Sequence, residues 1–332
     1  MHFCGNILRR ELEKPKSVFA YGVSSAIDAI VASQEAGHKF LYVGGYAASG
    51  LNGFPDMGLL TQTEMLEHVQ KLSNAINDDV CLIVDIDNGY GGVHNVRRTV
   101  YDICTKTRNV AAVHLEDQVI PKRCGHIAGK EILSQDEFLA KLNAAIDMKN
   151  SIDPSLVVIA RTDAFSAAGV NKDQRVGGDI NEAVKRGLAY SRAGADLVWC
   201  EFPKPDKLSA KEFSDGMKKF MPILGLAFNI SPSFNWNEFP NPIKTVELQE
   251  MGYKFLFSTY PSLTASVFYV HKIAKNFLRD PVEALKNLQT EVKGSPAESI
   301  KKLVGVDKYQ EIEMAYNKDA KNRIESTDGF KK

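Results

Sequence analysis

Acidic side chains follow four apolar segments of the sequence, at the residues where each segment ends. Asp85 and Asp87 follow one segment, Glu116 ends the next, Asp163 follows a third and Glu201 ends a fourth. A single aspartate at such a place could serve only as the N-cap of the next helix. Several carboxylates brought together repel one another unless a cation joins them. Oxygen ligands of this kind suit Mg²⁺, or Mn²⁺, better than Zn²⁺, so the sequence predicts a divalent metal site among these carboxylates.

A cysteine flanked by basic residues lies shortly after Glu116. Cys124 follows Lys122 and Arg123 and precedes His126 by two positions. Nearby positive charge stabilises a thiolate, so we expect a lowered thiol pKa and a catalytic role for Cys124. The residue type leaves open whether the thiol is a covalent nucleophile or a general acid. Glycines beside it would let the loop open and close.

The elements that must position these groups form a repeating pattern. Short apolar, β-branched segments alternate with longer amphipathic stretches, which is typical of a parallel sheet covered by helices. The expected strands span residues 17–22, 40–45, 80–85, 110–116, 156–161, 196–201, 222–227 and 255–259.

Eight such strands predict an α/β fold, a (β/α)8 barrel of the TIM type, in which the carboxyl ends of all strands meet at one mouth. A doubly wound open sheet is the alternative, but no GxGxxG follows the first strand. We expect residues 1–332 to form a single barrel domain, with 276–332 as a C-terminal helical extension.

Composition excludes several classes of protein. The 332 residues contain 41 basic and 41 acidic side chains, so no nucleic-acid or anionic-membrane partner is expected. No apolar run reaches the length of a membrane span. The five cysteines form no CxxC pair and the first residues carry no secretory signal pattern, so we expect a reduced, cytoplasmic protein.

Several longer segments resemble one enzyme family. KRCGH, within VHLEDQVIPKRCGHIAGK, resembles the signature loop of the isocitrate lyase and phosphoenolpyruvate mutase superfamily. The cysteine points to the lyase branch, because the mutases and phosphonopyruvate hydrolases lack it. The resemblance runs from about residue 16 to 275 and includes the segments DIDNGYGG, IARTDA, DLVWCEFPKPD, NISPSFNW and GYKFLFST.

The resemblance implies a role for each matching residue. Mg²⁺, or Mn²⁺ in its place, would be held directly or through water by Asp85, Asp87 and Glu116. The glyoxylate part of the substrate would contact Gly44, Gly45 and Tyr46. The succinate part would be held by Gly125, His126, Asn229, Ser231, Ser233 and Thr259. Arg161 would bind a carboxylate, and Cys124 would protonate the carbanion left by carbon–carbon cleavage. We take Cys124, His126, Arg161 and Glu201 as the candidate catalytic residues.

The substrate is less firmly indicated than the reaction type. SPSFNW and Thr259 favour an isocitrate lyase, which yields succinate and glyoxylate. Leu115, where isocitrate lyases usually have phenylalanine, favours a methylated substrate, and residues 54–58 resemble the shorter enzymes of the branch. Gly44 also stands where isocitrate lyases usually have serine, and Tyr46 where they have tryptophan. The alternatives are therefore a 2-methylisocitrate lyase, an oxaloacetate hydrolase or decarboxylase, and a catalytically silent barrel that only binds.

The resemblance also implies a homo-oligomer, with a tetramer as the expectation. Family members exchange a C-terminal helix between neighbouring subunits, and this chain has helical segments beyond those that a barrel needs.

Overall fold

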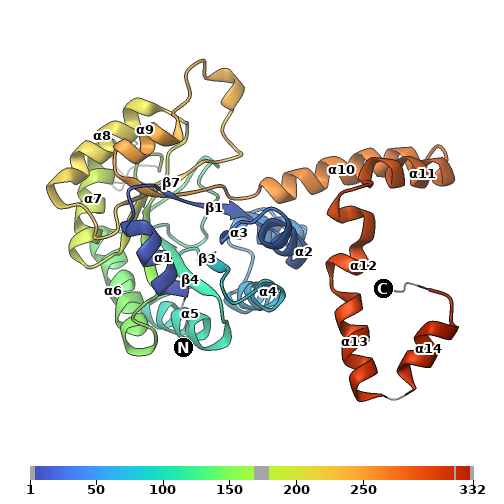
Figure 1. The fold of residues 1–332 in the computed structure, drawn as a ribbon. Helices are drawn as coiled ribbons and strands as arrows, with labels where there is room; N and C mark the ends of the chain where they lie inside the picture. Colours follow the sequence, from blue (N-terminus) through green and yellow to red (C-terminus); the bar gives the residue numbers. More distant parts are fainter. Residues whose placement is uncertain (1–3, 168–178, 318, 330–332) are drawn as a thin grey trace. The chain divides into compact units, whose positions relative to one another are not determined.

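The first compact unit of the protein is a closed barrel of eight parallel strands. The computed structural model describes residues 4–167, 179–317 and 319–329. It divides into two compact units, one of residues 1–33 and 37–264 and the other of residues 34–36 and 265–332. The barrel strands pair in chain order and the last pairs with the first, which confirms the predicted (β/α)8 fold and excludes an open sheet (Figure 1). They are β1 (Val18–Gly22), β2 (Phe40–Val43), β3 (Cys81–Asp85), β4 (Val110–Glu116), β5 (Val157–Thr162), β6 (Leu197–Cys200), β7 (Leu226–Asn229) and β8 (Tyr253–Phe257).

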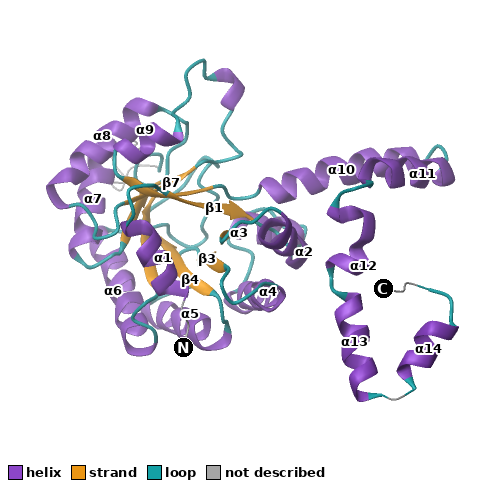
Figure 2. Ribbon diagram, viewed as in Figure 1, coloured by secondary structure: helices purple, strands orange, loops and turns teal. Residues whose placement is uncertain are grey.

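Helices surround the strands, as Figure 2 shows. Several begin at capping boxes, in which a Ser or Thr side chain and an acidic residue three positions later bond each other's backbone N–H groups, as Thr61 and Glu64 do. The α-helices of this layer are α2 (Ala26–Ile30), α3 (Gly45–Leu51), α4 (Gln62–Ala75), α5 (Val93–Lys106), α6 (Gln135–Ile152), α7 (Ile180–Arg192), α8 (Lys207–Met217) and α9 (Thr245–Glu250). Three short helical turns are the π-helix η1 (Val31–Glu35) and the 3₁₀-helices η2 (Lys218–Phe220) and η3 (Trp236–Glu238).

Side chains alternate between two hydrophobic clusters along each strand, because successive residues of a strand point to opposite faces. The outer cluster lies between the strands and the helices and includes Leu115 and Val113 of β4. The inner cluster fills the barrel and includes Ala112 of the same strand and Trp199 of β6. Leu115 points outward, toward the helices. Glu116 directly follows it and therefore points into the barrel, at the carboxyl end of the strand.

The predicted seventh and eighth strands differ most from the structure. The sequence places β7 at 222–227, but the strand runs from Leu226 to Asn229. Gly225 has φ of +93°, a left-handed conformation that a strand does not contain, so the strand begins after it. β8 begins and ends two residues earlier than predicted, at Tyr253 and Phe257.

An N-terminal helix that we did not predict closes one end of the barrel. α1 (Cys4–Glu13) buries Leu8 and Leu12 against the first residues of the barrel strands. Arg9 reinforces the closure, because its guanidinium bonds the carbonyl oxygens of Ser155 and Leu156 and pairs with Asp196. Solvent therefore reaches the barrel interior from the opposite end, where the strands end.

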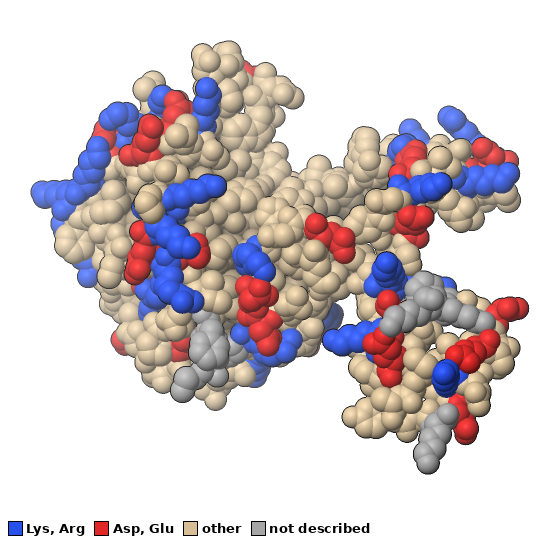
Figure 3. Space-filling view, in the orientation of Figure 1, with Lys and Arg blue, Asp and Glu red and all other residues tan. Residues whose placement is uncertain are grey.

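The second unit is helical. α10 (Pro261–Phe277) begins within the barrel unit, and the following elements are α11 (Pro281–Val292), the 3₁₀-helix η4 (Pro296–Ser299), α12 (Ile300–Leu303), α13 (Val306–Tyr316) and α14 (Ala320–Ser326). No helix of the described chain combines the length and the apolar character that crossing a bilayer requires. Basic and acidic side chains are mixed on the face that Figure 3 shows.

We predict that Leu8→Ala lowers the free energy of unfolding by about 2–5 kcal/mol, because it leaves a cavity beneath the barrel where Leu8 is fully buried. Urea denaturation measures the change. Leu208→Ala is the control, because Leu208 is 75% exposed and its loss should cost less than about 0.5 kcal/mol. Equal losses in the two variants would contradict the role given to α1.

Candidate active site

One cavity at the carboxyl ends of the barrel strands brings most of the predicted site residues together. The predicted residues that line it are Gly44, Tyr46, Asp85, Glu116, Cys124, Gly125, His126, Arg161, Glu201, Asn229, Ser231, Ser233 and Thr259. Gly45 and Asp87 lie beside the cavity rather than in its lining. The Gly45 N–H donates to an Asp85 oxygen at 2.9 Å, and Asp87 faces Lys122.

The Lys122 ammonium group lies among the predicted metal-binding carboxylates. Its Nζ is 2.6 Å from Asp87 Oδ1 and also bonds Asp56, and all three side chains are buried. Asp85 receives the backbone N–H of Asp87 at 2.8 Å on its other oxygen. Lys122 thus supplies positive charge where the sequence predicted a divalent cation. In the part of the chain that the structure describes, no three His, Cys, Asp or Glu side chains converge as a metal-binding group.

The ionisation of these carboxylates nevertheless favours an added cation. Burial, together with the charges of Asp85 and Asp56, raises the pKa of Asp87 to about 7 despite Lys122. Burial also raises the pKa of Glu116 well above its usual range, although Arg161 opposes it. Asp85 differs, because its interactions with His114 and Lys122 outweigh burial and lower its pKa. A metal ion would stabilise the charged forms of Asp87 and Glu116, so this donor set fits a hard divalent cation.

Cys124 corrects one prediction. The thiol is 8% exposed rather than in an open loop, and burial raises its pKa to about 12, where the sequence suggested a lowered value. The negative charge of Asp56 adds to this effect. The prediction failed because Lys122 is directed to Asp56 and Asp87, which cancel its charge near the sulfur. The thiol therefore keeps its proton at neutral pH, which suits a general acid better than a nucleophile.

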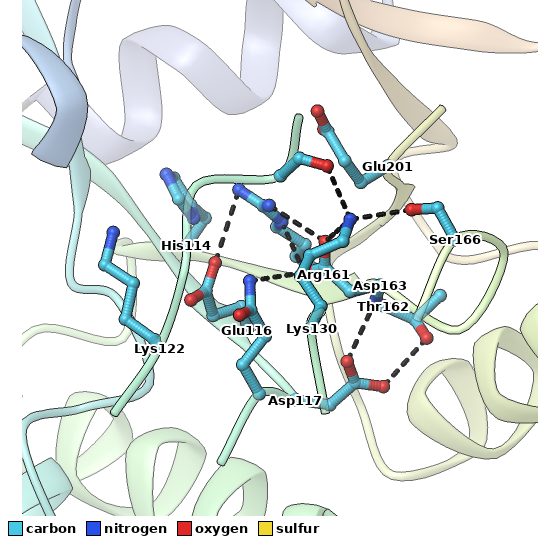
Figure 4. A network of polar contacts seen from close by, with 12 residues as sticks. His114, Glu116, Asp117, Lys122, Lys130, Arg161, Thr162, Asp163, Ser166 and Glu201 are labelled. Carbon is cyan, nitrogen blue, oxygen red and sulfur yellow. Dashed lines mark hydrogen bonds and ion pairs between the residues drawn. The ribbon is translucent and has the colours of Figure 1, made fainter. Parts of the chain in front are cut away.

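Arg161 lines the cavity and is held there by Glu116 of β4 and by Asp163, which directly follows β5 (Figure 4). Its Nε and Nη2 atoms donate to the two oxygens of Asp163 at 2.9 and 3.0 Å. Its Nη1 atom lies 3.3 Å from Glu116, and its guanidinium lies 4.3 Å from the centre of the Trp199 ring. The bidentate pair fixes the plane of the guanidinium toward the cavity.

Hydroxyl and aromatic groups form the opposite side. The Ser233 hydroxyl lies 2.6 Å from the Tyr260 hydroxyl, and the Ser233 backbone N–H donates to Ser231 Oγ. The Tyr260 ring stacks on Tyr46 with centroids 4.3 Å apart. Ser233 is therefore linked through Tyr260 to Tyr46, the residue that the sequence assigned to the other end of the substrate.

Unpaired polar atoms concentrate in this cavity. Most buried polar atoms in proteins have hydrogen-bond partners, so a group of unpaired ones that lines a cavity indicates a place where a polar ligand can bind. Among the described residues, the buried side-chain atoms of the lining that lack a hydrogen-bond partner are Glu116 Oε1, His126 Nε2, Glu201 Oε2, Asn229 Oδ1 and Trp199 Nε1. They include both donors and acceptors, as a hydroxylated polycarboxylate would require.

The sequence did not reveal several groups that line or support the cavity. The Tyr42 hydroxyl group and His114 Nε2 form a hydrogen bond of 2.5 Å, and His114 Nε2 also lies 3.3 Å from Asp85 Oδ1. Both residues lie inside strands, where an apolar pattern hides them. Asp56 stands alone in a loop segment, and only the loop's return to the barrel brings it to Lys122. The inward-facing alternation along β2 and β4 is the signal that could have identified Tyr42 and His114.

A barrel whose strand ends present buried carboxylates, an oriented arginine and a protected thiol defines an enzyme class that catalyses acid–base chemistry on a small anionic substrate. The family comparison is specific. Residues 8–277 match the phosphoenolpyruvate phosphomutase family model, and the chain belongs to this family, within the PEP mutase/isocitrate lyase superfamily. The predicted family is confirmed, and the protein is a carbon–carbon lyase of this superfamily.

Two curated relatives and one solved structure are similar over nearly their whole length. An isocitrate lyase of Haloferax volcanii is 41% identical over 97% of this chain and 90% of its own length. A 2,3-dimethylmalate lyase of Eubacterium barkeri is 34% identical over 93% of this chain and 96% of its own length. A crystal structure of 2,3-dimethylmalate lyase superposes with a TM-score of 0.79 at 28% identity, covering 96% of each chain.

We predict that iodoacetamide alkylates Cys124 at pH 7 at least about a hundredfold more slowly than a free thiol, because a raised pKa leaves little thiolate. The rate should increase with pH up to the limit of the protein's stability. Mass spectrometry of the peptide that contains Cys124 measures it, with glutathione as the control. A rate at pH 7 equal to that of glutathione would contradict the raised pKa.

Proposed function

We propose that the protein is a Mg²⁺-dependent lyase that cleaves isocitrate to succinate and glyoxylate. The observation that carries the proposal is a single cavity that combines a protonated cysteine, an oriented arginine, buried carboxylates and a wall of amide and hydroxyl groups. That wall consists of Asn229, Ser231, Ser233 and Thr259. The similarity to the Haloferax volcanii isocitrate lyase over nearly the whole chain supports the same substrate.

The metal would be held by Asp85, Asp87 and Glu116. Their pKa values and the unpaired Glu116 Oε1 atom support this assignment. When bound, the ion would act as a Lewis acid that lowers the pKa of the substrate's hydroxyl group. Mn²⁺ has similar ligand preferences and is the expected substitute.

The chain's own residues would bind the substrate and protonate the carbon that leaves. Arg161 would bind a substrate carboxylate, and its pairing with Asp163 fixes its orientation beforehand. Asn229 and the two serines would hold the succinate part. Cys124 would donate its thiol proton to the carbon that leaves as a carbanion, and a raised thiol pKa keeps that proton in place until then.

A lyase with a methylated substrate is the second candidate. The 2,3-dimethylmalate lyase of Eubacterium barkeri and several 2-methylisocitrate lyases are also similar to this chain. Leu115, whose size suggested room for a methyl group, belongs to the outer hydrophobic cluster, and the cavity lining does not include it. Any influence of Leu115 on the substrate would act through the neighbouring loop, where its side chain approaches Gly89.

We predict that, with Mg²⁺, isocitrate yields glyoxylate with a kcat/KM at least about tenfold above the value for 2-methylisocitrate or 2,3-dimethylmalate, because one added or missing carbon group in a fitted site changes kcat/KM by about 10–200-fold. Trapping the released keto acid as its hydrazone measures the rate, and a chelator should abolish it. A preference for a methylated acid would replace isocitrate in the proposal. If oxaloacetate is the only acid that reacts, and it releases acetate or carbon dioxide, the proposed reaction would be replaced by hydrolysis or decarboxylation.

We predict that Cys124→Ser lowers kcat by about 10²–10⁴-fold, because a serine hydroxyl is a weaker acid at the same position. KM should change little, since Cys124 acts on the reacting carbon. Cys104→Ser is the matched control, because Cys104 is a buried thiol of α5 outside the cavity. Unchanged turnover in Cys124→Ser would remove the cysteine from the mechanism, and absence of turnover in the unmodified protein would favour a binding role.

We also propose that the protein forms a homotetramer. Four consecutive apolar residues of α10, Val267 to Val270, are each at least half exposed in the single chain. We predict that sedimentation velocity at micromolar concentration shows a species of about four times the chain mass, and that Phe268→Glu shifts it to smaller species. A monomer at that concentration would contradict the proposal.

A further inference from the structure

The loop that carries Cys124 is held to the barrel by a second buried lysine, Lys130. Its side chain is 2% exposed, and it lies six residues after the cysteine. The ammonium group donates to the carbonyl oxygen of Gly125 at 2.5 Å, to Asp163 Oδ1 at 2.7 Å and to Ser166 Oγ at 2.6 Å (Figure 4). An ammonium group has three donors, so Lys130 uses all of them within the protein.

Gln118 holds the other side of the cysteine in the same way. Its side-chain oxygen accepts the backbone N–H of Arg123 at 2.9 Å, and its Nε2 atom donates to the Arg123 carbonyl oxygen at 2.8 Å. Nε2 also lies 3.3 Å from Asp163 Oδ2. The residues before and after Cys124 are therefore both connected to Asp163, one through Gln118 and the other through Lys130.

Asp163 is itself fixed at the end of β5. Its two oxygens bind the Arg161 guanidinium, and its backbone N–H donates to Asp117. Asp163 thus connects the loop to Arg161 through its carboxylate, and it is joined to the barrel wall through its backbone N–H. None of these three connections needs a bound ligand.

The fit at Gly125 is tight. A Cβ atom at this position would lie 2.6 Å from Arg161 Nη2 and 2.7 Å from Glu201 Oε1, so only glycine allows the loop backbone to come this close. A small displacement of this backbone would therefore change the distance from Cys124 to any group bound at Arg161.

We propose that Lys130 is a positioning residue, which together with Gln118 anchors both neighbours of Cys124 to Asp163 and so sets the position and burial of the thiol relative to Arg161. The part of this inference that concerns turnover rests on the proposed lyase function. The part that concerns the burial of the thiol does not.

Lys130→Met tests the proposal, because it removes all three hydrogen bonds while Arg161 still neutralises Asp163. The first readout is alkylation of Cys124 by iodoacetamide at pH 8, which we expect to be at least about tenfold faster than in the unmodified protein, because local opening exposes the thiol. The second is steady-state kinetics with isocitrate, in which kcat should fall by about a hundredfold while KM changes much less, because a displacement of about 1 Å is sufficient for such a loss.

Lys149→Met is the matched control. Lys149 is also buried, and it donates to Asp196 Oδ2 at 2.8 Å and to the Leu156 carbonyl oxygen at 2.9 Å, near the start of β5 and far from the cavity lining. It should lower the melting temperature as Lys130→Met does, yet leave alkylation and kcat unchanged. If both variants accelerate alkylation equally, the effect is general destabilisation and the proposal is wrong.

Gln118→Met keeps the test decisive if Lys130→Met does not fold. It removes an uncharged side chain and should also accelerate alkylation of Cys124 and lower kcat with little change in KM. Alkylation at the unmodified rate in either folded variant would overturn the proposal. If the unmodified protein shows no turnover, the proposed function fails, and the alkylation rates still decide the positioning role.

Discussion

Compensation of buried negative charge at the mouth of the barrel is the constraint on which the site depends. Parallel strands bring Asp85, Glu116 and Asp163 to one end, and a low-dielectric interior makes their mutual repulsion costly. Three buried cations compensate this negative charge. Arg161 pairs with Glu116, Lys130 pairs with Asp163, and Lys122 pairs with Asp87 beside Asp85. Removal of Lys122 or Arg161 would leave a buried carboxylate without its partner, and removal of Lys130 would leave Asp163 with Arg161 alone, so these side chains are not independent of one another.

This charge pairing also determines the shape of the loop after β4. Lys122 and Lys130 lie on either side of Cys124 in the sequence, and they pair with carboxylates that follow different strands, Asp87 after β3 and Asp163 after β5. The path of the loop must therefore bring one lysine to the end of β3 and the other to the end of β5. Burial of the thiol is a consequence of that path, and so is its raised pKa.

The sequence predicted the parts of this arrangement that follow from strand ends. Asp85, Glu116, Arg161 and Glu201 end apolar segments, and a barrel topology alone places them at one mouth. It could not predict partners that depend on the path of a loop. Lys122 was expected to activate the thiol because the two are neighbours in sequence, whereas in the structure its ammonium group binds carboxylates from other loops.

The remaining discrepancies have local physical causes. Gly225 adopts a positive φ that delays the start of β7, and an apolar pattern around it gives no sign of that conformation. The helix α1 lies in a segment whose mixed basic and acidic residues suggest no element by themselves. The spacing of Leu8 and Leu12 is helical and is the signal that predicts it. Tyr42 and His114 are polar groups inside strands, and their contact exists only because both side chains point into the barrel from β2 and β4, on either side of β3.

The protected thiol has a consequence for the durability of the protein. Peroxides react with thiolates far faster than with thiols, and a sulfinic or sulfonic acid is in practice not reduced back. A buried, protonated cysteine is therefore resistant to oxidative damage. The loop opening that we expect from the neighbouring glycines would expose the same cysteine each time substrate and product exchange. The rate at which this protein loses activity in air would then follow how often it turns over rather than how long it stands.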